Sequence, residues 1–150
     1  MRFTDLDLPA PLRDALTSRG YLEATPVQSD VLNAALAGRD LLVSSRTASG
    51  KTVAFGLTLA PLLLPTPEHR AGPAGHPRAL VMAPTRELAM QVERELQWLF
   101  AGTGLRTVAC VGGVPFGPQA RALEGGDEAI GVCSGYDIYL SSKRIKRNII

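Results

Sequence analysis

The sequence predicts an α/β fold in which a parallel sheet is flanked by helices. Four short runs have the length and continuous apolarity of buried parallel strands, and they lie at residues 40–45, 78–84, 106–113 and 128–133. Stretches with helical length and helical start signals alternate with these runs. Because strands that alternate with helices form βαβ units, we expect one parallel sheet with right-handed crossovers.

Most of the expected helices have a start signal. The stretch 52–64 follows a glycine, and 85–100 opens with a capping threonine and an acidic first turn. A shorter helix is expected over 116–123. Near the N-terminus, helices are expected over 11–19 and 26–37, because each stretch begins at a proline, which suits a first helical turn.

Length and composition favour one globular domain. Of the 150 residues, 45% are hydrophobic and 20% are charged, and a chain of this size can bury roughly 70% of its unfolded surface. No apolar run approaches the roughly 20 residues of a membrane span, and the N-terminus lacks the apolar stretch of a signal peptide. We therefore expect no membrane association and a cytoplasmic location. Cys110 and Cys133 have no metal-ligand spacing with His69 or His76, so we expect two buried thiols.

The stretch SRTASGKT, residues 45–52, has the position of a phosphate-binding loop. The usual pattern begins with glycine, whereas Ser45 stands there in this chain. The setting fits nevertheless, because a helix N-terminus and successive backbone N–H groups would point at an anion. Gly50 would admit the phosphates, Lys51 would place its charge on the β and γ oxygens, and Thr52 would offer its hydroxyl to Mg²⁺. The alternative is an ordinary turn with a solvated lysine.

Four stretches, in this order, resemble motifs of the DEAD-box RNA helicases. GYLEATPVQ (20–28) resembles the Q motif, SRTASGKT motif I, PTRELA (84–89) motif Ia, and the glycine pair 112–113 the GG motif. PTRELA is highly specific for that family, and Phe3 matches its isolated upstream aromatic. The resemblance covers roughly residues 1–130. It implies a three-layer, RecA-like P-loop NTPase fold, truncated here, with a parallel sheet between helices.

The resemblance implies ATP with Mg²⁺ as the bound nucleotide. Gln28 would read adenine, because a carboxamide matches the N6 amino group and N7 with one donor and one acceptor; the alternative is an exposed helix glutamine. Phe3 and Tyr21 could pack near the adenine or form a local hydrophobic staple. Lys51 and Thr52 would be catalytic, with Thr52 also the metal ligand. The implied nucleotide-binding set is Phe3, Tyr21, Thr25, Gln28, Ser45, Arg46, Thr47, Ala48, Ser49, Gly50, Lys51, Thr52 and Val53.

Two loop positions depart from the family's usual residues. Motif I usually opens with alanine, so Ser45 is a mild change. Glycine usually occupies the position of Ala48. If the loop needs a positive φ there, alanine costs about 1 kcal/mol or more, and nucleotide binding would be weakened.

RNA is the partner that the resemblance implies, contacted through its backbone and without sequence preference. Thr85 and Arg86 open a helix after a strand, so a hydroxyl, a guanidinium and helix amides can face a phosphodiester. A surface ion pair or capping box of Arg86 with Glu87 is the alternative. Trp98 is expected in the core rather than as a base-stacking platform. The implied RNA-binding set is Pro84, Thr85, Arg86, Gly112 and Gly113.

The family's hydrolytic apparatus is incomplete in this sequence. The family hydrolyses ATP with an Asp-Glu-Ala-Asp motif and with arginines of a second RecA-like domain, and neither is found here. The resemblance thus implies an ATP-dependent RNA helicase, which couples ATP binding and hydrolysis to local unwinding of RNA duplexes, but little or no turnover by this chain alone. A stand-alone nucleotide-binding module without hydrolysis is the alternative. The oligomeric state and the RNA substrate are not predictable.

Residues 134–150 differ in composition from residues 1–133, the expected RecA-like portion with its Q motif in 1–29. SGYD (134–137) stands where the family has Thr-Pro-Gly-Arg, and four of the 16 basic side chains follow it. We therefore expect a divergent basic tail. It could contact RNA phosphates non-specifically or be a solvated end.

Overall fold

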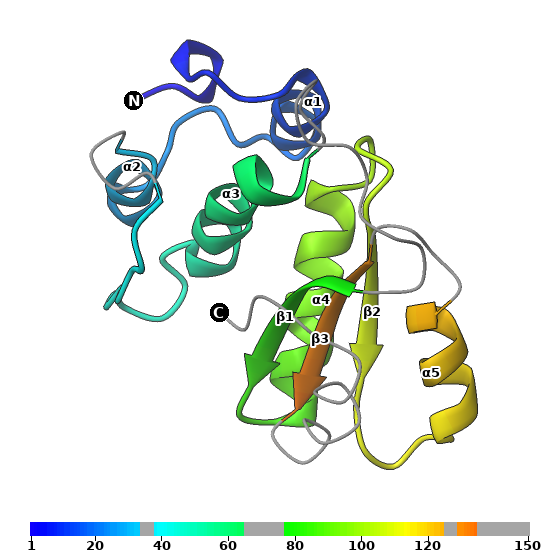
Figure 1. Ribbon diagram of the computed structural model, residues 1–150. Coiled ribbons are helices and arrows are strands. Elements are labelled where there is room, and N and C mark those ends of the chain that lie inside the picture. The colour runs from blue at the N-terminus through cyan, green and yellow to red at the C-terminus, as the bar shows by residue number, and fades with distance from the viewer. Residues whose placement is uncertain (34–37, 65–76, 125–128, 135–150) are drawn as a thin grey trace.

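The computed structural model describes residues 1–33, 38–64, 77–124 and 129–134 (Figure 1). Strands and helices alternate from residue 51 onward, as expected, and none of the helices in this described part of the chain is long and apolar enough to cross a membrane. The elements are η1 (Phe3–Asp5), α1 (Ala10–Ser18), α2 (Pro26–Val31), α3 (Lys51–Leu63), β1 (Pro77–Ala83), α4 (Arg86–Leu99), β2 (Arg106–Cys110), α5 (Phe116–Glu124) and β3 (Ala129–Ser134).

The three strands form one parallel sheet in the order β1-β3-β2. The central strand is therefore the last in sequence. Ala83 of β1 is in register with Ser134 of β3, and Cys110 of β2 is in register with Cys133. The carboxyl ends of the strands consequently lie at one edge, from which the loops after β1 and β2 emerge. The predicted parallel α/β fold is confirmed.

Helices cover both faces of the sheet and create three layers (Figure 1). On one face, Ile130 and Val132 of β3 belong to the main core together with Leu96 of α4. On the other face, Cys133 of β3 packs in a smaller cluster with Leu123 of α5. This division follows from the alternation of side chains along a strand. Both cysteines are buried, as expected.

The N-terminal helices pack mainly against other helices. α2 contacts α3, and α1 contacts α4. Gly56 allows α3 to approach α4, since a Cβ there would lie 2.6 Å from Leu99 Cδ2. Trp98 of α4 stacks with Tyr21, with ring centroids 5.6 Å apart, and the guanidinium carbon of Arg19 lies 5.1 Å from the centroid of its ring. Trp98 thus has a packing role, as expected.

The strand expected over 40–45 is not formed. Residues 40–46 carry no β-pairing, and Leu42 is fully exposed, at 102% of its reference area. A strand needs a neighbour for its backbone N–H and C=O groups, and within the described residues the sheet ends at β1. An apolar run predicts the tendency to form a strand but cannot supply the partner.

Two other expectations extend beyond the described residues. The helix expected over 26–37 is α2, which ends at Val31, so the expectation is wrong for residues 32 and 33, and 34–37 lie outside the described part. All of the tail except Ser134, the last residue of β3, lies outside it too.

Candidate functional site

Residues 45–50 form the turn that leads into α3. Gly50 is the N-cap residue of α3, with φ 82° and ψ 24°. This left-handed conformation costs glycine little. Lys51, Thr52 and Val53 then form the first helical turn, where backbone N–H groups lack partners within the helix. The loop therefore has the helix N-terminus that anion binding requires.

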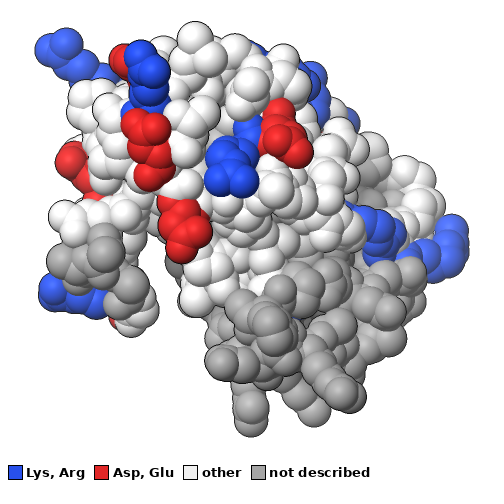
Figure 2. Space-filling model, turned by 90° about the horizontal axis from the view of Figure 1, so that it is seen from above, with Lys and Arg blue, Asp and Glu red and all other residues white. Residues whose placement is uncertain are grey.

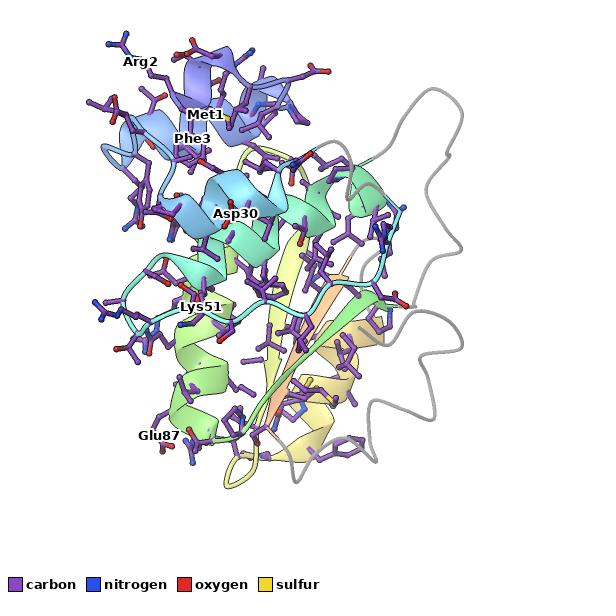
Figure 3. The ribbon with its side chains drawn as sticks, turned by 90° about the vertical axis from the view of Figure 1, so that its left-hand side faces the viewer. Met1, Arg2, Phe3, Asp30, Lys51 and Glu87 are labelled. Carbon is purple, nitrogen blue, oxygen red and sulfur yellow. The ribbon has the colours of Figure 1, made fainter. Side chains whose placement is uncertain are left out.

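The Lys51 side chain folds back over this loop (Figure 3). Its Nζ donates a hydrogen bond to the carbonyl of Ser45 at 2.7 Å and another to the carbonyl of Arg46. Ser45 Oγ also donates to Ser49 Oγ at 2.7 Å, which braces the loop across its width. The ammonium group is thus held at the loop by carbonyls that an anion could replace.

Ala48 is the strained residue of the loop. Its φ of 60° makes it the one residue other than glycine with positive φ in the described part of the chain. A left-handed conformation costs an L-residue roughly 1–2 kcal/mol. The sequence predicts weaker nucleotide binding if position 48 has a positive φ, and the structure has that φ.

Thr25 lies just before α2 and Gln28 lies within it, and both side chains hydrogen-bond to the loop. Thr25 Oγ1 donates to the carbonyl of Ser49 at 2.9 Å, and Gln28 Nε2 donates to the carbonyl of Gly50 at 3.2 Å. Gln28 Oε1 accepts from the Thr25 backbone N–H at 2.9 Å. Gln28 is 0% exposed, so the alternative of an exposed helix glutamine is wrong. Its contact with adenine stays a prediction.

The aromatic residues expected near adenine pack against other parts of the protein. Phe3 is 2% exposed in the main core, and it lies well apart from Lys51 in Figure 3. Tyr21 stacks on Trp98 of α4. The local hydrophobic staple that the sequence left open stays a prediction. Direct nucleotide contacts of Phe3 and Tyr21 stay predictions.

Thr85 caps α4 at the carboxyl edge of the sheet. It follows β1 and Pro84, and its Oγ1 accepts a hydrogen bond from the Leu88 backbone N–H at 3.2 Å. This satisfies one orphan donor of the helix. Arg86 and Glu87 lie in the first helical turn, and Figure 3 shows Glu87 at the opposite end of the molecule from Phe3.

The glycine pair meets Arg86 at this same edge. Gly113, with φ 79°, follows β2. A Cβ built on Gly113 would lie 2.7 Å from Arg86 Nη1, so the guanidinium rests against the glycine backbone. Any other residue at position 113 would displace it. The structure thus brings together two stretches, around 85 and 112, that the sequence could only link by motif order.

Both signs of charge occur on the face shown in Figure 2, where basic and acidic side chains of the described residues lie near one another over the N-terminal part of the molecule. A continuous basic patch would be the electrostatic footprint of nucleic-acid binding. This face is seen from above and does not include the carboxyl edge of the sheet, where Arg86 meets Gly113 (Figure 1).

Sequence reasoning missed Gln119. This glutamine lies in α5 and hydrogen-bonds to the backbone of the loop that carries the glycine pair. A single glutamine in a short amphipathic helix has no pattern that distinguishes it from a surface residue. Only the folded position of the β2–α5 loop does so.

The sheet, its two helical layers and the Gly-Lys-Thr loop at the start of α3 define the class of protein, an α/β domain with a RecA-like fold. A sequence model described as DEAD/DEAH box helicase matches residues 25–147. The chain belongs to the DEAD/DEAH box helicase family. The match includes most of 134–150, and the divergence of that stretch stays a prediction.

The chain is also similar to bacterial RNA helicases. The chain is 38% identical to the ATP-dependent RNA helicase RhlB of Aliivibrio salmonicida over 125 residues, which are 83% of this chain and 29% of that protein. It is 35% identical to RhlB of Vibrio parahaemolyticus over 144 residues, which are 96% of this chain and 33% of that protein. The chain therefore spans about a third of the length of these relatives.

Solved structures confirm the RecA-like fold. The RNA helicase Prp28 from Chaetomium thermophilum, bound to ADP, matches with a TM-score of 0.76 and 35% identity, covering 95% of this chain and 35% of that one. A DEAD box protein from Methanococcus jannaschii matches with a TM-score of 0.78 and 28% identity, covering 96% of this chain and 37% of that one.

Proposed function

We propose that this chain binds Mg-ATP at the loop 45–52 and the RNA backbone at the edge formed by Thr85, Arg86 and Gly113. In this proposal it is the N-terminal portion of a helicase that couples ATP binding and hydrolysis to local unwinding of RNA duplexes. The RhlB relatives are named ATP-dependent RNA helicases, and the Prp28 structure is bound to ADP, which supports the choice of nucleotide.

One observation carries the proposal: the Q-motif residues hold the loop directly. Thr25 and Gln28 bond to the carbonyls of Ser49 and Gly50, next to the lysine that would meet the phosphates. A side chain that recognises adenine and also holds the phosphate loop would make the loop's shape depend on the base. This coupling favours ATP over a nucleotide whose base Gln28 cannot match.

The residues fit Mg-ATP in their chemistry. Lys51 can exchange its two carbonyl partners for phosphate oxygens, which are better acceptors for an ammonium group. The first N–H groups of α3 can bind the same phosphates, and the Thr52 hydroxyl can serve Mg²⁺. When bound, ATP supplies the phosphoanhydride bond and Mg²⁺ neutralises its charge. Ala48 opposes binding if the bound loop keeps its strained φ.

Thermal unfolding with and without Mg-ATP tests the nucleotide site. Ligand at about ten times its dissociation constant adds about 1.4 kcal/mol, which should raise the midpoint by roughly 3–6 °C in a domain of this size. Lys51→Ala should remove that shift, whereas the matched control Arg121→Ala, which removes an exposed charge on α5, should keep it. A shift that survives in Lys51→Ala, or none in the unaltered and cooperatively folded chain, would refute the site.

A nucleotide-binding module without hydrolysis is the second candidate. It is favoured by the strained Ala48 of the loop. Under either candidate this chain alone is expected to release little phosphate from Mg-ATP, so the encoding reading frame separates the two. A reading frame that continues into an Asp-Glu-Ala-Asp motif would support the helicase, and a frame without that motif would support the module.

A further inference from the structure

The side chain of Gln119 hydrogen-bonds to the loop that carries the glycine pair. Residues 111–115 connect β2 to α5, and Gln119 of α5 reaches back onto them. Its Oε1 accepts the Val111 backbone N–H at 2.8 Å. Its Nε2 lies 3.2, 3.4 and 3.3 Å from the carbonyls of Val111, Val114 and Pro115. A single carboxamide thus contacts the first and the last two residues of the loop.

A carboxamide supplies both the acceptor and the donors that this set of partners uses. Val111 is bonded through both its N–H and its carbonyl, which requires an acceptor and a donor on the same group. Two N–H hydrogens face three carbonyls, so at least one hydrogen is shared. A glutamate at position 119 would place an acceptor beside three carbonyls, and a methionine of similar size would offer neither a strong donor nor a strong acceptor.

The fastened backbone lies on both sides of Gly113. Val111 precedes the glycine pair and Val114 follows it, and both are bonded to Gln119. Gly113 in turn has a left-handed φ of 79°, and a Cβ built on it would lie 2.7 Å from Arg86 Nη1. Gln119 therefore determines where the glycine backbone lies relative to the guanidinium.

We propose that Gln119 is a positioning residue for RNA backbone binding. It holds the 111–115 loop in one conformation before RNA arrives, so that Gly113 and Arg86 present a preformed site for a phosphodiester. Ordering a loop upon binding lowers affinity, and preorganisation removes that cost. This inference rests on the proposed RNA function and adds the residue that shapes the site.

The test compares Gln119→Met with Gln97→Met in the full chain. Gln97 is an exposed glutamine near the C-terminal end of α4, so the control makes the same neutral change away from the loop. The probe is a fluorescent single-stranded oligouridylate, measured by anisotropy with a non-hydrolysable Mg-ATP analogue. Gln119→Met should bind about tenfold more weakly, comparable to the loss of one or two neutral hydrogen bonds. Amide hydrogen exchange at 111–115 should accelerate, while affinity for the Mg-ATP analogue stays within about twofold.

The outcomes separate positioning from general stability. Wild-type RNA affinity in Gln119→Met would overturn the inference. Equal losses of RNA and nucleotide affinity would also overturn it, because they would indicate damage to the whole domain. The unaltered chain is measured first. If it binds nucleotide but not RNA, the proposed RNA function fails, and the inference fails with it.

Discussion

The loops of the proposed RNA site and the proposed nucleotide loop differ in how they begin. The loops after β1 and β2 emerge from strands that both pair with β3, so a backbone ladder fixes where they begin. The proposed nucleotide loop, 45–52, is preceded by residues 40–44, which carry no β-pairing, and side chains of Thr25 and Gln28 hold it. The loop after β2 has a side-chain partner as well, Gln119, but it has the ladder in addition.

The largest effect on the unfolding free energy is expected in the sheet, from which the loops of the proposed RNA site emerge. Ile130 of β3 is 0% exposed and belongs to the main core. Ile130→Ala should reduce the free energy of unfolding by about 2–5 kcal/mol, because it removes buried methyl groups and leaves a cavity. Urea unfolding measures this loss. A reduction below about 1 kcal/mol would mean that the central strand is not the anchor described here.

Removing the carboxamide that holds the nucleotide loop should cost somewhat less. Gln28→Leu keeps the side-chain volume but leaves the Gly50 carbonyl and the Thr25 N–H without this partner. We expect a loss of about 2–4 kcal/mol in unfolding free energy, together with loss of Mg-ATP binding in titration calorimetry. Unchanged nucleotide affinity in a folded Gln28→Leu chain would contradict the role of Gln28 at the loop.

On the RNA side, Arg86→Ala should weaken RNA binding by about tenfold, because it removes one charged phosphate contact. The slope of log affinity against log salt should become less steep by about 0.7 for a single-stranded probe. Arg94→Ala is the matched control on the same helix, where the guanidinium bonds to the Met90 carbonyl. An equal loss in both variants would indicate non-specific attraction in place of a site at Gly113.

Ala48→Gly should have a smaller and favourable effect. It relieves the positive φ of Ala48, and the net gain should be at most about 1 kcal/mol, because glycine also loses more chain entropy on folding. Unfolding midpoints and Mg-ATP affinity should both rise slightly. A destabilised variant would show that the loop does not hold this conformation in solution.

The smallest effect is expected at Leu42. Because this side chain is fully exposed, Leu42→Glu should change the unfolding free energy by no more than about 0.5 kcal/mol. The comparison with Ile130→Ala uses the same urea titration. A loss above about 1 kcal/mol would mean that residues 40–45 pair as a buried strand.

Local signals in the sequence predicted most of the fold. Gly50 and Thr85 stand immediately before two of the expected helices, and the runs around 80, 108 and 131 do form the sheet. The run at 40–45 is also predicted as a strand, but a strand forms only where a neighbouring strand can pair with it, and no local pattern specifies that neighbour. Gln119 escaped prediction for a similar reason, since its partners are backbone groups of another segment. Ala48 differs from these cases, because the expectation concerned only its own backbone φ, which is positive in the structure.

Amide hydrogen exchange of the full chain, with and without Mg-ATP, is the most direct test of a nucleotide loop held by side chains. Without nucleotide, residues 41–47 should exchange rapidly while β1 and β3 are protected. Mg-ATP should slow exchange at the start of α3 and in the loop, and Gln28→Leu should abolish that change. Protection of 41–45 equal to that of β3 without nucleotide, or an unchanged response to Mg-ATP in Gln28→Leu, would contradict it.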